Sequence, residues 1–147
     1  RSTLFPYTTL FRSEPFVVYV DDSKGTNVAA SVTAMTSLEG RKVVILGGRG
    51  KGEDYAPLAE AVAREADAAV LLGEEREAIA DALRKAGFSA IRMAENMEEA
   101  VLTARELARP GMTVLLSPAC TSWDMYANYG ERGDHFRSIV RGLKVEP

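Results

Sequence analysis

Short apolar runs alternate with longer segments of mixed polarity along most of the chain. The apolar runs lie at residues 16–20 (FVVYV), 42–46 (KVVIL), 68–72 (AAVLL) and 113–116 (TVLL), with a weaker run at residues 89–92. They lack the polar–apolar alternation of a strand that has one face in water. The runs therefore predict a mostly parallel sheet that is buried on both faces, with a peripheral strand at residues 89–92.

Helix-start and helix-stop residues lie between these predicted strands. Asn96 and Glu99 have the spacing of a capping box, and Gly87 is typical of a helix terminator. Such signals predict helices from Thr26 or Asn27 to about Leu38, from Asp54 (with Pro57 in the first turn) to about Ala66, from Glu75 to Ala86, from Asn96 to before Pro110, and from about Arg132 to Val140 after one or two helical turns. The alternation predicts one doubly wound α/β domain, a mostly parallel sheet with helices on both faces.

Composition fits a single domain with a sizeable core. The chain has 147 residues, of which 46% are hydrophobic, enough for one core and too few residues for two. Its net charge is −3 and no block of like charge stands out, so we expect neither nucleic acid nor a membrane as a partner. A single cysteine, Cys120, excludes an internal disulfide and fits a reducing cytoplasm. No apolar run approaches the ~20 residues of a membrane helix, so we expect a soluble cytoplasmic protein.

The first thirteen residues (RSTLFPYTTLFRS) differ in composition from the rest of the chain. They contain no acidic residue and no alanine, and Pro6 interrupts the apolar stretch that a signal peptide needs. The segment resembles translated sequencing-adapter sequence joined to a truncated gene. We therefore expect residues 1–13 to be a non-native, disordered leader and residues 14–147 to form the domain, with the natural protein extending upstream. A natural flexible leader is the alternative.

Three chemically unusual loops follow the ends of predicted strands. They are residues 21–27 (DDSKGTN), 47–54 (GGRGKGED) and 117–134 (SPACTSWDMYANYGERGD), whereas the loops at the opposite strand ends are ordinary turns. Ligands of doubly wound folds bind outside the carboxyl ends of the strands. This asymmetry predicts a ligand site formed by the three loops.

The glycine-rich loop at residues 47–52 does not match a known phosphate-loop pattern. Ile45 and Gly52 occupy the positions where a P-loop needs glycine and Ser or Thr, and Glu53 stands where a dinucleotide fingerprint needs its third glycine. What remains is a turn with exposed backbone N–H groups and two cations, Arg49 and Lys51, which suits a carboxylate or a phosphate. A merely tight strand-to-helix turn is an equal alternative.

The first loop carries two carboxylates and an amine. Asp21 and Asp22 can accept hydrogen bonds from ribose hydroxyls, and Lys24 can neutralise a phosphate. The alternative is a solvated turn with a local Asp–Lys pair. Thr26 is expected to act first as a helix cap, although its hydroxyl can also face a ligand.

The third loop offers only weak catalytic candidates. A Cys120–His135 dyad has no evident orienting acid, so we favour a buried cysteine and an exposed histidine. Trp123, Tyr126 and Tyr129 either cradle a ligand or pack a short helix. No cluster has metal-ligand spacing, so we expect no metal site.

Taken together and in order, the loops resemble those of the C-terminal domain of bacterial Mur ligases. The matching residues are 22–27, 46–52 and 116–126, with Asn128, residues 131–133 and Phe136. The Asp-Ser-Lys-x-Thr-Asn pattern of the first loop resembles the branch of the family that adds D-glutamate. Gly25, Gly50 and Trp123 depart from the residues usual in that branch, but they remove no ligand group, and Gly25 is expected only to loosen its loop.

The resemblance implies a Rossmann-like domain of a three-domain, ATP-dependent ligase. That enzyme adds D-glutamate to UDP-N-acetylmuramoyl-L-alanine in cytoplasmic peptidoglycan precursor synthesis, and so serves cell wall biogenesis, cell shape and cell division. The resemblance also implies ATP and Mg²⁺ as cofactors, bound mainly by a central domain that this chain lacks. We therefore expect this chain alone to be inactive and to have the missing N-terminal and central domains as its partners.

The same resemblance assigns roles to particular residues, none of them catalytic and none a metal ligand. The D-glutamate site would contain Thr26, Lys51 and Ser122, with backbone around Trp123 and Tyr129, and the nucleotide would be faced by Asp22 and Lys24. Two other classes of function stay open. One is a stand-alone, non-catalytic module that binds a nucleotide or an acidic metabolite, and the other is a purely structural partner domain.

Overall fold

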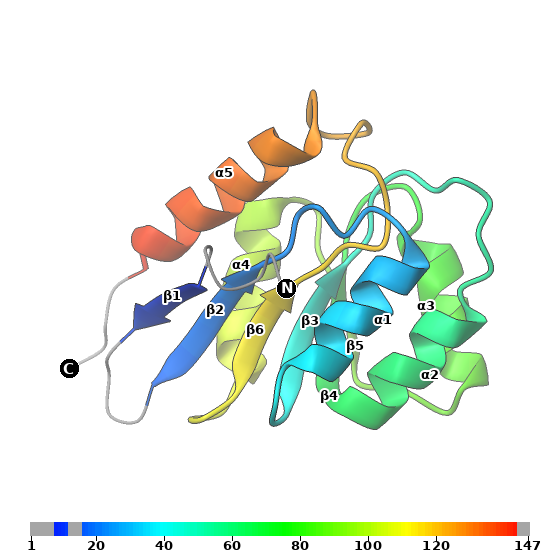
Figure 1. The fold of residues 1–147 in the computed structure, drawn as a ribbon, viewed down its shortest axis with the longest axis horizontal. Helices are drawn as coiled ribbons and strands as arrows, with labels where there is room; N and C mark the ends of the chain where they lie inside the picture. Colours follow the sequence, from blue (N-terminus) through cyan, green and yellow to red (C-terminus); the bar gives the residue numbers. More distant parts are fainter. Residues whose placement is uncertain (1–7, 12–15, 144–147) are drawn as a thin grey trace.

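The computed structural model describes residues 8–11 and 16–143, which form one sheet covered by helices (Figure 1). The strands are β1 (Thr8–Phe11), β2 (Val17–Asp21), β3 (Lys42–Leu46), β4 (Ala66–Leu71), β5 (Ile91–Met93) and β6 (Thr113–Leu116). The helices are α1 (Val28–Ser37), α2 (Ala56–Glu65), α3 (Arg76–Lys85), α4 (Met97–Leu107) and α5 (Tyr129–Arg141). Among the residues described, none of these helices is long and apolar enough to cross a membrane.

The sheet has the strand order β1-β2-β6-β3-β4-β5. Strands β2, β6, β3, β4 and β5 run parallel to one another, and β6 pairs with β2 on one side and with β3 on the other. The last strand of the chain is therefore central in the sheet. The predicted mostly parallel sheet is confirmed.

Helices cover both faces of the sheet, as a doubly wound fold requires. In β3, Val44 and Leu46 pack in the core under α1, α2 and α3, whereas Val43 and Ile45 pack in the core under α4 and α5. All five residues of β3 are buried, which explains the continuous apolar run that predicted this strand.

Two asparagines begin helices as the sequence predicted. The Asn27 side chain accepts a hydrogen bond from the Ala30 amide at 2.8 Å, so Asn27 rather than Thr26 caps α1. The Asn96 side chain accepts from the Glu99 amide at 2.8 Å and begins α4. The Glu99 carboxylate in turn accepts from the Glu95 amide at 2.8 Å, one residue before the cap.

Two helix starts differ from the prediction. The N-cap residue of α2 is Tyr55 and not the predicted Asp54, and the Tyr55 side chain makes no capping hydrogen bond. The Asp54 carboxylate, one residue earlier, accepts from the Ala56 amide at 2.9 Å. Helix α5 begins at Tyr129, before the predicted start, because Asn128 accepts from the Glu131 amide at 2.8 Å. In place of the one or two helical turns predicted ahead of α5, the chain makes a single turn at residues 123–125.

An edge strand lies within the segment that we expected to be outside the fold. Residues Thr8–Phe11 form β1, which pairs antiparallel with β2. The expectation of disorder was wrong for these four residues, because β2 presents an open edge whose backbone groups need partners, and Thr and Phe favour strands. The rest of residues 1–13 lies outside the described residues.

Candidate functional site

Three loops meet at the carboxyl edge of the sheet. We call them the β2 loop (residues 22–27), the β3 loop (residues 47–55) and the β6 loop (residues 117–128). Because β2, β6 and β3 are parallel neighbours, their carboxyl ends lie side by side, and the start of α5 lies above them (Figure 1). This is the edge at which the sequence predicted a ligand site.

Buried hydrogen bonds join the β2 loop to the β6 loop. The Ser117 hydroxyl donates to Asp22 Oδ2 at 2.7 Å, and the Ala119 amide donates to the Gly25 carbonyl at 2.8 Å. A Cβ at Gly25 would lie 2.6 Å from Ser117 Oγ, so Gly25 permits this contact and does more than loosen the loop. The Asp22 carboxylate is buried and takes part in the internal framework of the site.

The β3 loop pairs with the β6 loop through main-chain bonds. The amides of Arg49 and Thr121 each donate to the other residue's carbonyl at 3.0 Å, and the Gly47 amide donates to the Pro118 carbonyl at 2.9 Å. Gly48 has φ +146°, and a Cβ there would lie 2.2 Å from the Thr121 carbonyl oxygen. Glycine at this position is therefore required for the two loops to approach each other.

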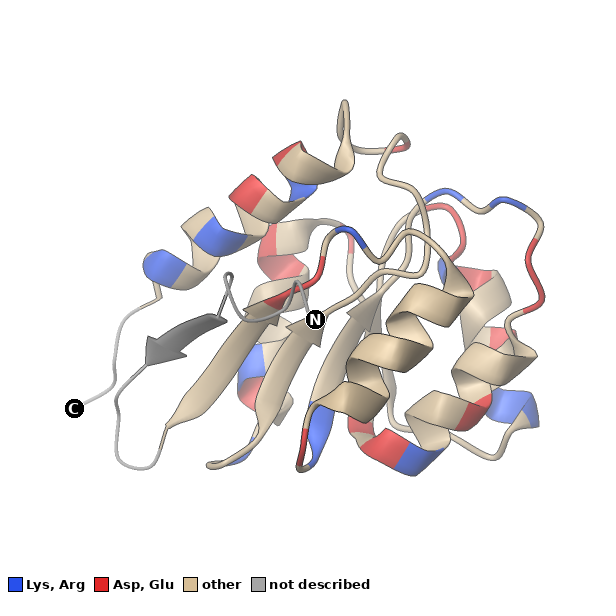
Figure 2. Cartoon of the chain, in the orientation of Figure 1, with Lys and Arg blue, Asp and Glu red and all other residues tan. Residues whose placement is uncertain are grey.

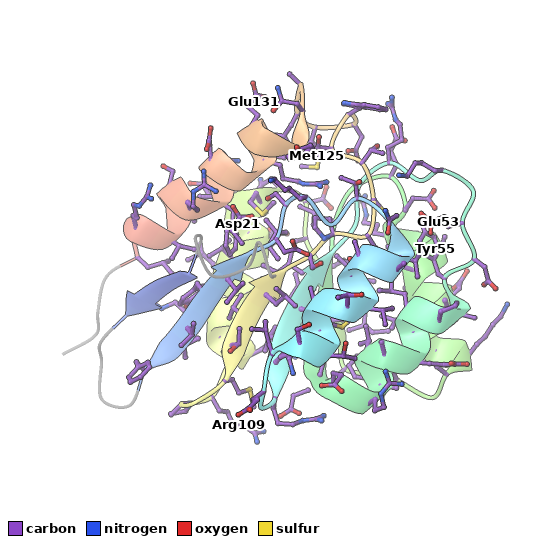
Figure 3. The ribbon with its side chains drawn as sticks, viewed as in Figure 1. Asp21, Glu53, Tyr55, Arg109, Met125 and Glu131 are labelled. Atoms are coloured by element: carbon purple, nitrogen blue, oxygen red, sulfur yellow. The ribbon has the colours of Figure 1, made fainter. Side chains whose placement is uncertain are left out.

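A third contact joins the β3 loop to the start of α1. The Glu53 carboxylate accepts from the Val28 amide at 3.2 Å. Figure 3 labels Glu53 near this end of α1. This contact brings the segment around Lys51 close to the segment around Thr26. Thr26 is half-buried and Lys51 is exposed.

The cations of the three loops differ in their partners. Arg49 forms a two-point ion pair with Glu74, with N–O distances of 3.2 and 3.1 Å, and these hydrogen bonds lower the pKa of Glu74. Lys24 and Lys51 are exposed and form no ion pair with any residue that the structure describes. Figure 2 shows basic residues on the β2 and β3 loops. The two lysines are thus available to an anionic ligand, whereas Arg49 is already neutralised.

The other predicted D-glutamate residues lie in the β6 loop and at the start of α5. Ser122 is buried, and its carbonyl accepts from the amides of Met125 and Tyr126 at 3.1 and 2.7 Å, which forms the turn. Trp123 is 63% exposed and Tyr129 is 45% exposed. Because Ser122 follows Thr121, which pairs with the β3 loop, its segment lies beside that of Lys51.

A small cavity of about 190 Å³ lies between the β2 loop and the first turns of α5. Asp22, Lys24 and Tyr129 line it, together with Arg137, which forms an ion pair with Asp21. The predicted nucleotide residues therefore lie together with Tyr129. Of the residues assigned to the D-glutamate site, Tyr129 alone is among those that line this cavity.

A larger cavity of about 430 Å³ lies beside the end of β4 and has an acidic lining. Glu74, Glu77, Glu95 and Asp124 line it together with Arg76. Within residues 16–143, no group of three or more His, Cys, Asp or Glu side chains could hold a metal ion. Its acidic lining makes this cavity unsuitable for an acidic ligand.

Comparison with known proteins identifies the family. The model of the family described as "Mur ligase, glutamate ligase domain" matches residues 9–120. The chain belongs to this family. It is also 48% identical over 128 residues to UDP-N-acetylmuramoylalanine--D-glutamate ligase of Pelotomaculum thermopropionicum, a match that covers 87% of this chain and 28% of that protein. The chain thus spans about a quarter of the length of the curated relatives it matches.

Solved structures agree on the fold of this Mur ligase domain. Folylpolyglutamate synthase of Mycobacterium tuberculosis, complexed with ADP, is 19% identical with a TM-score of 0.57, and the match covers 94% of this chain and 32% of that one. UDP-N-acetylmuramate-alanine ligase of Thermotoga maritima is 15% identical with a TM-score of 0.58, covering 93% of this chain and 30% of that one. Both confirm the Rossmann-like α/β fold.

The Mur ligase domain does not form the Cys120–His135 dyad. Cys120 Sγ lies 3.5 Å from the Tyr55 hydroxyl, whereas His135 Nδ1 lies 2.6 Å from the Tyr126 hydroxyl. Burial raises the pKa of the Cys120 thiol to about 11, so the thiol is protonated at neutral pH. The favoured interpretation, a buried cysteine and an exposed histidine, is confirmed.

Sequence reasoning assigned no role in the site to Arg132. Its side chain is 3% exposed, and it donates from Nη2 to the Ser23 carbonyl at 2.8 Å and from Nη1 to the Cys120 carbonyl at 3.1 Å. The next residue, Gly133, lets α5 approach the β2 loop, because a Cβ there would lie 2.7 Å from Asp21 Oδ2. An arginine on an amphipathic helix is usually exposed, so only the resemblance of residues 131–133 could have singled it out.

Proposed function

We propose that this chain is the C-terminal, amino-acid-delivering domain of an ATP-dependent ligase that adds D-glutamate to UDP-N-acetylmuramoyl-L-alanine in cytoplasmic peptidoglycan precursor synthesis. One observation carries the proposal: of the cations in the three loops, Lys24 and Lys51 have no anionic partner in the part of the chain that is described. They lie at the ligand-binding edge of a domain whose relatives are named as D-glutamate ligases.

Lys51, Thr26 and Ser122 hold the two carboxylates of D-glutamate. The contact of Glu53 with Val28 and the Arg49–Thr121 pair support this assignment, because they bring the three segments together. The Thr26 hydroxyl has no hydrogen-bond partner among the described residues and is open to a carboxylate. The backbone around Trp123 and Tyr129 completes the site as the resemblance implies, although Tyr129 lines the cavity of Asp22 and Lys24 instead.

The contribution of this domain to the reaction is positioning. ATP, with Mg²⁺, supplies the phosphoryl group that activates the substrate carboxylate. That transfer would leave ADP and an acyl phosphate. Held by its carboxylates, D-glutamate would present its amine to the acyl carbon, and the tetrahedral intermediate would collapse to the amide with loss of phosphate and a proton. Fixed charge at the carboxylates lowers the barrier by orienting the nucleophile before it reacts.

Lys24 and Asp22 face the nucleotide. Lys24 is exposed beside the cavity at α5 and can neutralise a phosphate. Asp22 Oδ2 already accepts from Ser117, so its first effect is to hold the β2 loop in place.

Substitution of Lys51 in the complete ligase tests the proposed function. Lys51→Ala should raise the apparent KM for D-glutamate by about tenfold to a hundredfold, because a charge-assisted hydrogen bond contributes about 1.5–3 kcal/mol. The apparent KM for ATP should change much less. Lys85→Ala is the matched control, because Lys85 is also exposed but is the last residue of α3, away from the loops. Equal effects on both KM values, or no effect, would contradict the assignment.

A further inference from the structure

The guanidinium of Arg132 lies where the three loops meet. It donates to Ser23 of the β2 loop and to Cys120 of the β6 loop. Its Nη1 also lies 3.4 Å from the position that a Cβ of Gly48 would occupy, so it reaches the β3 loop as well. A single side chain of α5 therefore bonds to two of the loops and lies beside the third.

The environment of this guanidinium does not favour the burial of a charge, so a contribution to stability does not by itself explain the residue. Its acceptors are two backbone carbonyls, no carboxylate lies within hydrogen-bond distance among the described residues, and Nε is buried without a partner. Burial lowers the pKa of Arg132 to about 10. Burial of a charge without an opposite charge costs free energy that hydrogen bonds to two carbonyls only partly offset, so the geometry of the arginine calls for another explanation.

We propose that Arg132 is a positioning residue for the amino-acid site, because its two Nη groups fix the spacing of the β2 and β6 loops. Ser23 precedes Thr26 in one loop, and Cys120 precedes Ser122 in the other. Because both carbonyls bond to the same planar guanidinium, the distance between the two loops is fixed. The distance between the Thr26 and Ser122 hydroxyls, which are proposed to bind D-glutamate, is then fixed as well. A lysine cannot do this, because its ammonium is a single point that does not match two separated acceptors. The inference rests on the proposed function.

Two substitutions in the complete ligase test this role. Arg132→Lys keeps the charge and loses the fork, and Arg132→Met loses both. Each should raise the KM for D-glutamate by about tenfold or more, because a displaced Thr26 or Ser122 hydroxyl loses its charge-assisted hydrogen bond to a substrate carboxylate. The KM for the UDP-linked substrate should not change, because its binding does not depend on the spacing of these loops.

Lys42→Met is the matched control. Lys42 is a fully buried cation at the opposite edge of the sheet, where Nζ donates to the Gly40 carbonyl at 2.6 Å and to Glu65 at 3.1 Å. Its loss should destabilise the domain and reduce the amount of active enzyme, which lowers the apparent kcat and leaves every KM unchanged. A wild-type KM for D-glutamate in Arg132→Lys, or a pattern like that of Lys42→Met in both variants, would overturn the inference.

A second variant covers the case in which both Arg132 substitutions prevent folding. Gly133→Ala keeps the guanidinium but pushes α5 away from the β2 loop, since its Cβ would lie 2.9 Å from Ser23 Oγ. It should raise the KM for D-glutamate in the same way. An unchanged KM in this variant would overturn the role of Arg132.

Failure of the proposed function gives a different result from failure of this inference. Phosphate release by the wild-type ligase is measured first with D-glutamate, and its absence contradicts the proposed function alone.

The positioning role is then tested by measuring hydrogen exchange at the Ala119 and Thr121 amides, which bond to the carbonyls of Gly25 and Arg49. Exchange in Arg132→Lys should be faster at these amides than in Lys42→Met. Equal exchange would reject the role of Arg132.

Discussion

The amino and carboxyl edges of the sheet differ in whether their lysines have carboxylate partners. At the amino edge two cations have carboxylate partners, since Arg41 pairs with Asp67 at 2.7 Å and Lys42 pairs with Glu65 at 3.1 Å. At the carboxyl edge Lys24 and Lys51 have no such partner in the described residues. Figure 3 shows Asp21 and Glu53 at the carboxyl edge and Arg109 at the opposite one.

Buried polar side chains follow the same division. Among the described residues, Lys42 is the only one at the amino edge. The others lie at or beside the carboxyl edge: Asp21, Asp22, Ser23, Ser31, Ser117, Thr121, Ser122 and Arg132. Interior polar networks hold a backbone in one arrangement when their members are satisfied. The exposed Lys24 and Lys51 therefore extend from loops that buried hydrogen bonds hold in place, as a preorganised site requires.

Glycine substitutions should show the largest contrast between the edges. Gly48→Ala should lower the free energy of unfolding by about 4 kcal/mol, because the new Cβ meets the Thr121 carbonyl at 2.2 Å. Gly40→Ala at the amino edge has a similarly positive φ (+83°) but nothing within 4 Å, so it should cost only about 1 kcal/mol. Urea unfolding of both variants measures the difference. Equal losses would show that the loops do not need this close approach.

Serine substitutions should show a smaller contrast. Ser117→Ala should lower the free energy of unfolding by about 2–3 kcal/mol, because it leaves the buried Asp22 carboxylate without the donor at 2.7 Å. Ser37→Ala is the control, since that exposed hydroxyl donates to the Thr33 carbonyl at the far end of α1. The control should change stability by less than about 0.5 kcal/mol. A similar result for both variants in urea would mean that the Ser117–Asp22 bond adds no stability.

Alkaline pH should give the smallest effect. Burial raises the pKa of Cys120 to about 11, above its value in the unfolded chain, so the folded state retains the thiol proton to higher pH. The stability this provides is complete below the unfolded pKa and is lost as the pH rises through the folded pKa. From pH 8 to pH 10.5, wild type should lose about 1–2 kcal/mol more than Cys120→Ala in urea unfolding. Parallel curves would show that the thiol does not titrate differently on folding.

The elements of the fold were predictable because their signals are local. The apolar runs at residues 42–46 and 113–116 match β3 and β6, and Asn96 begins α4 as predicted. The boundary at Ala66 was harder to predict, because β4 begins directly after α2 with no glycine or proline between them. The pairing of β4 with β3 also starts with an irregular register at Lys42. The strand β1 was missed because its pairing depends on the open edge of β2 and not on its own pattern.

The site was predictable in place but not in detail. Strand ends located the three loops, yet the sequence does not show that Arg49 pairs with Glu74 while Lys51 has no partner. The contact of Arg132 with Ser23 joins residues 109 positions apart, so no local pattern reveals it. The Asn128–Glu131 cap was readable, since it repeats the spacing of Asn96 and Glu99.

The central position of β6 has a consequence for biosynthesis. Strand β6 separates β2 from β3, and Val18 finds its parallel partner only in Thr113. A nascent chain therefore exposes the apolar edges of both strands until most of the domain has left the ribosome. Closing so long a loop slows the search for the native topology. A chain that ends before residue 113 has no strand to fill the position between β2 and β3, so the middle of its sheet is incomplete.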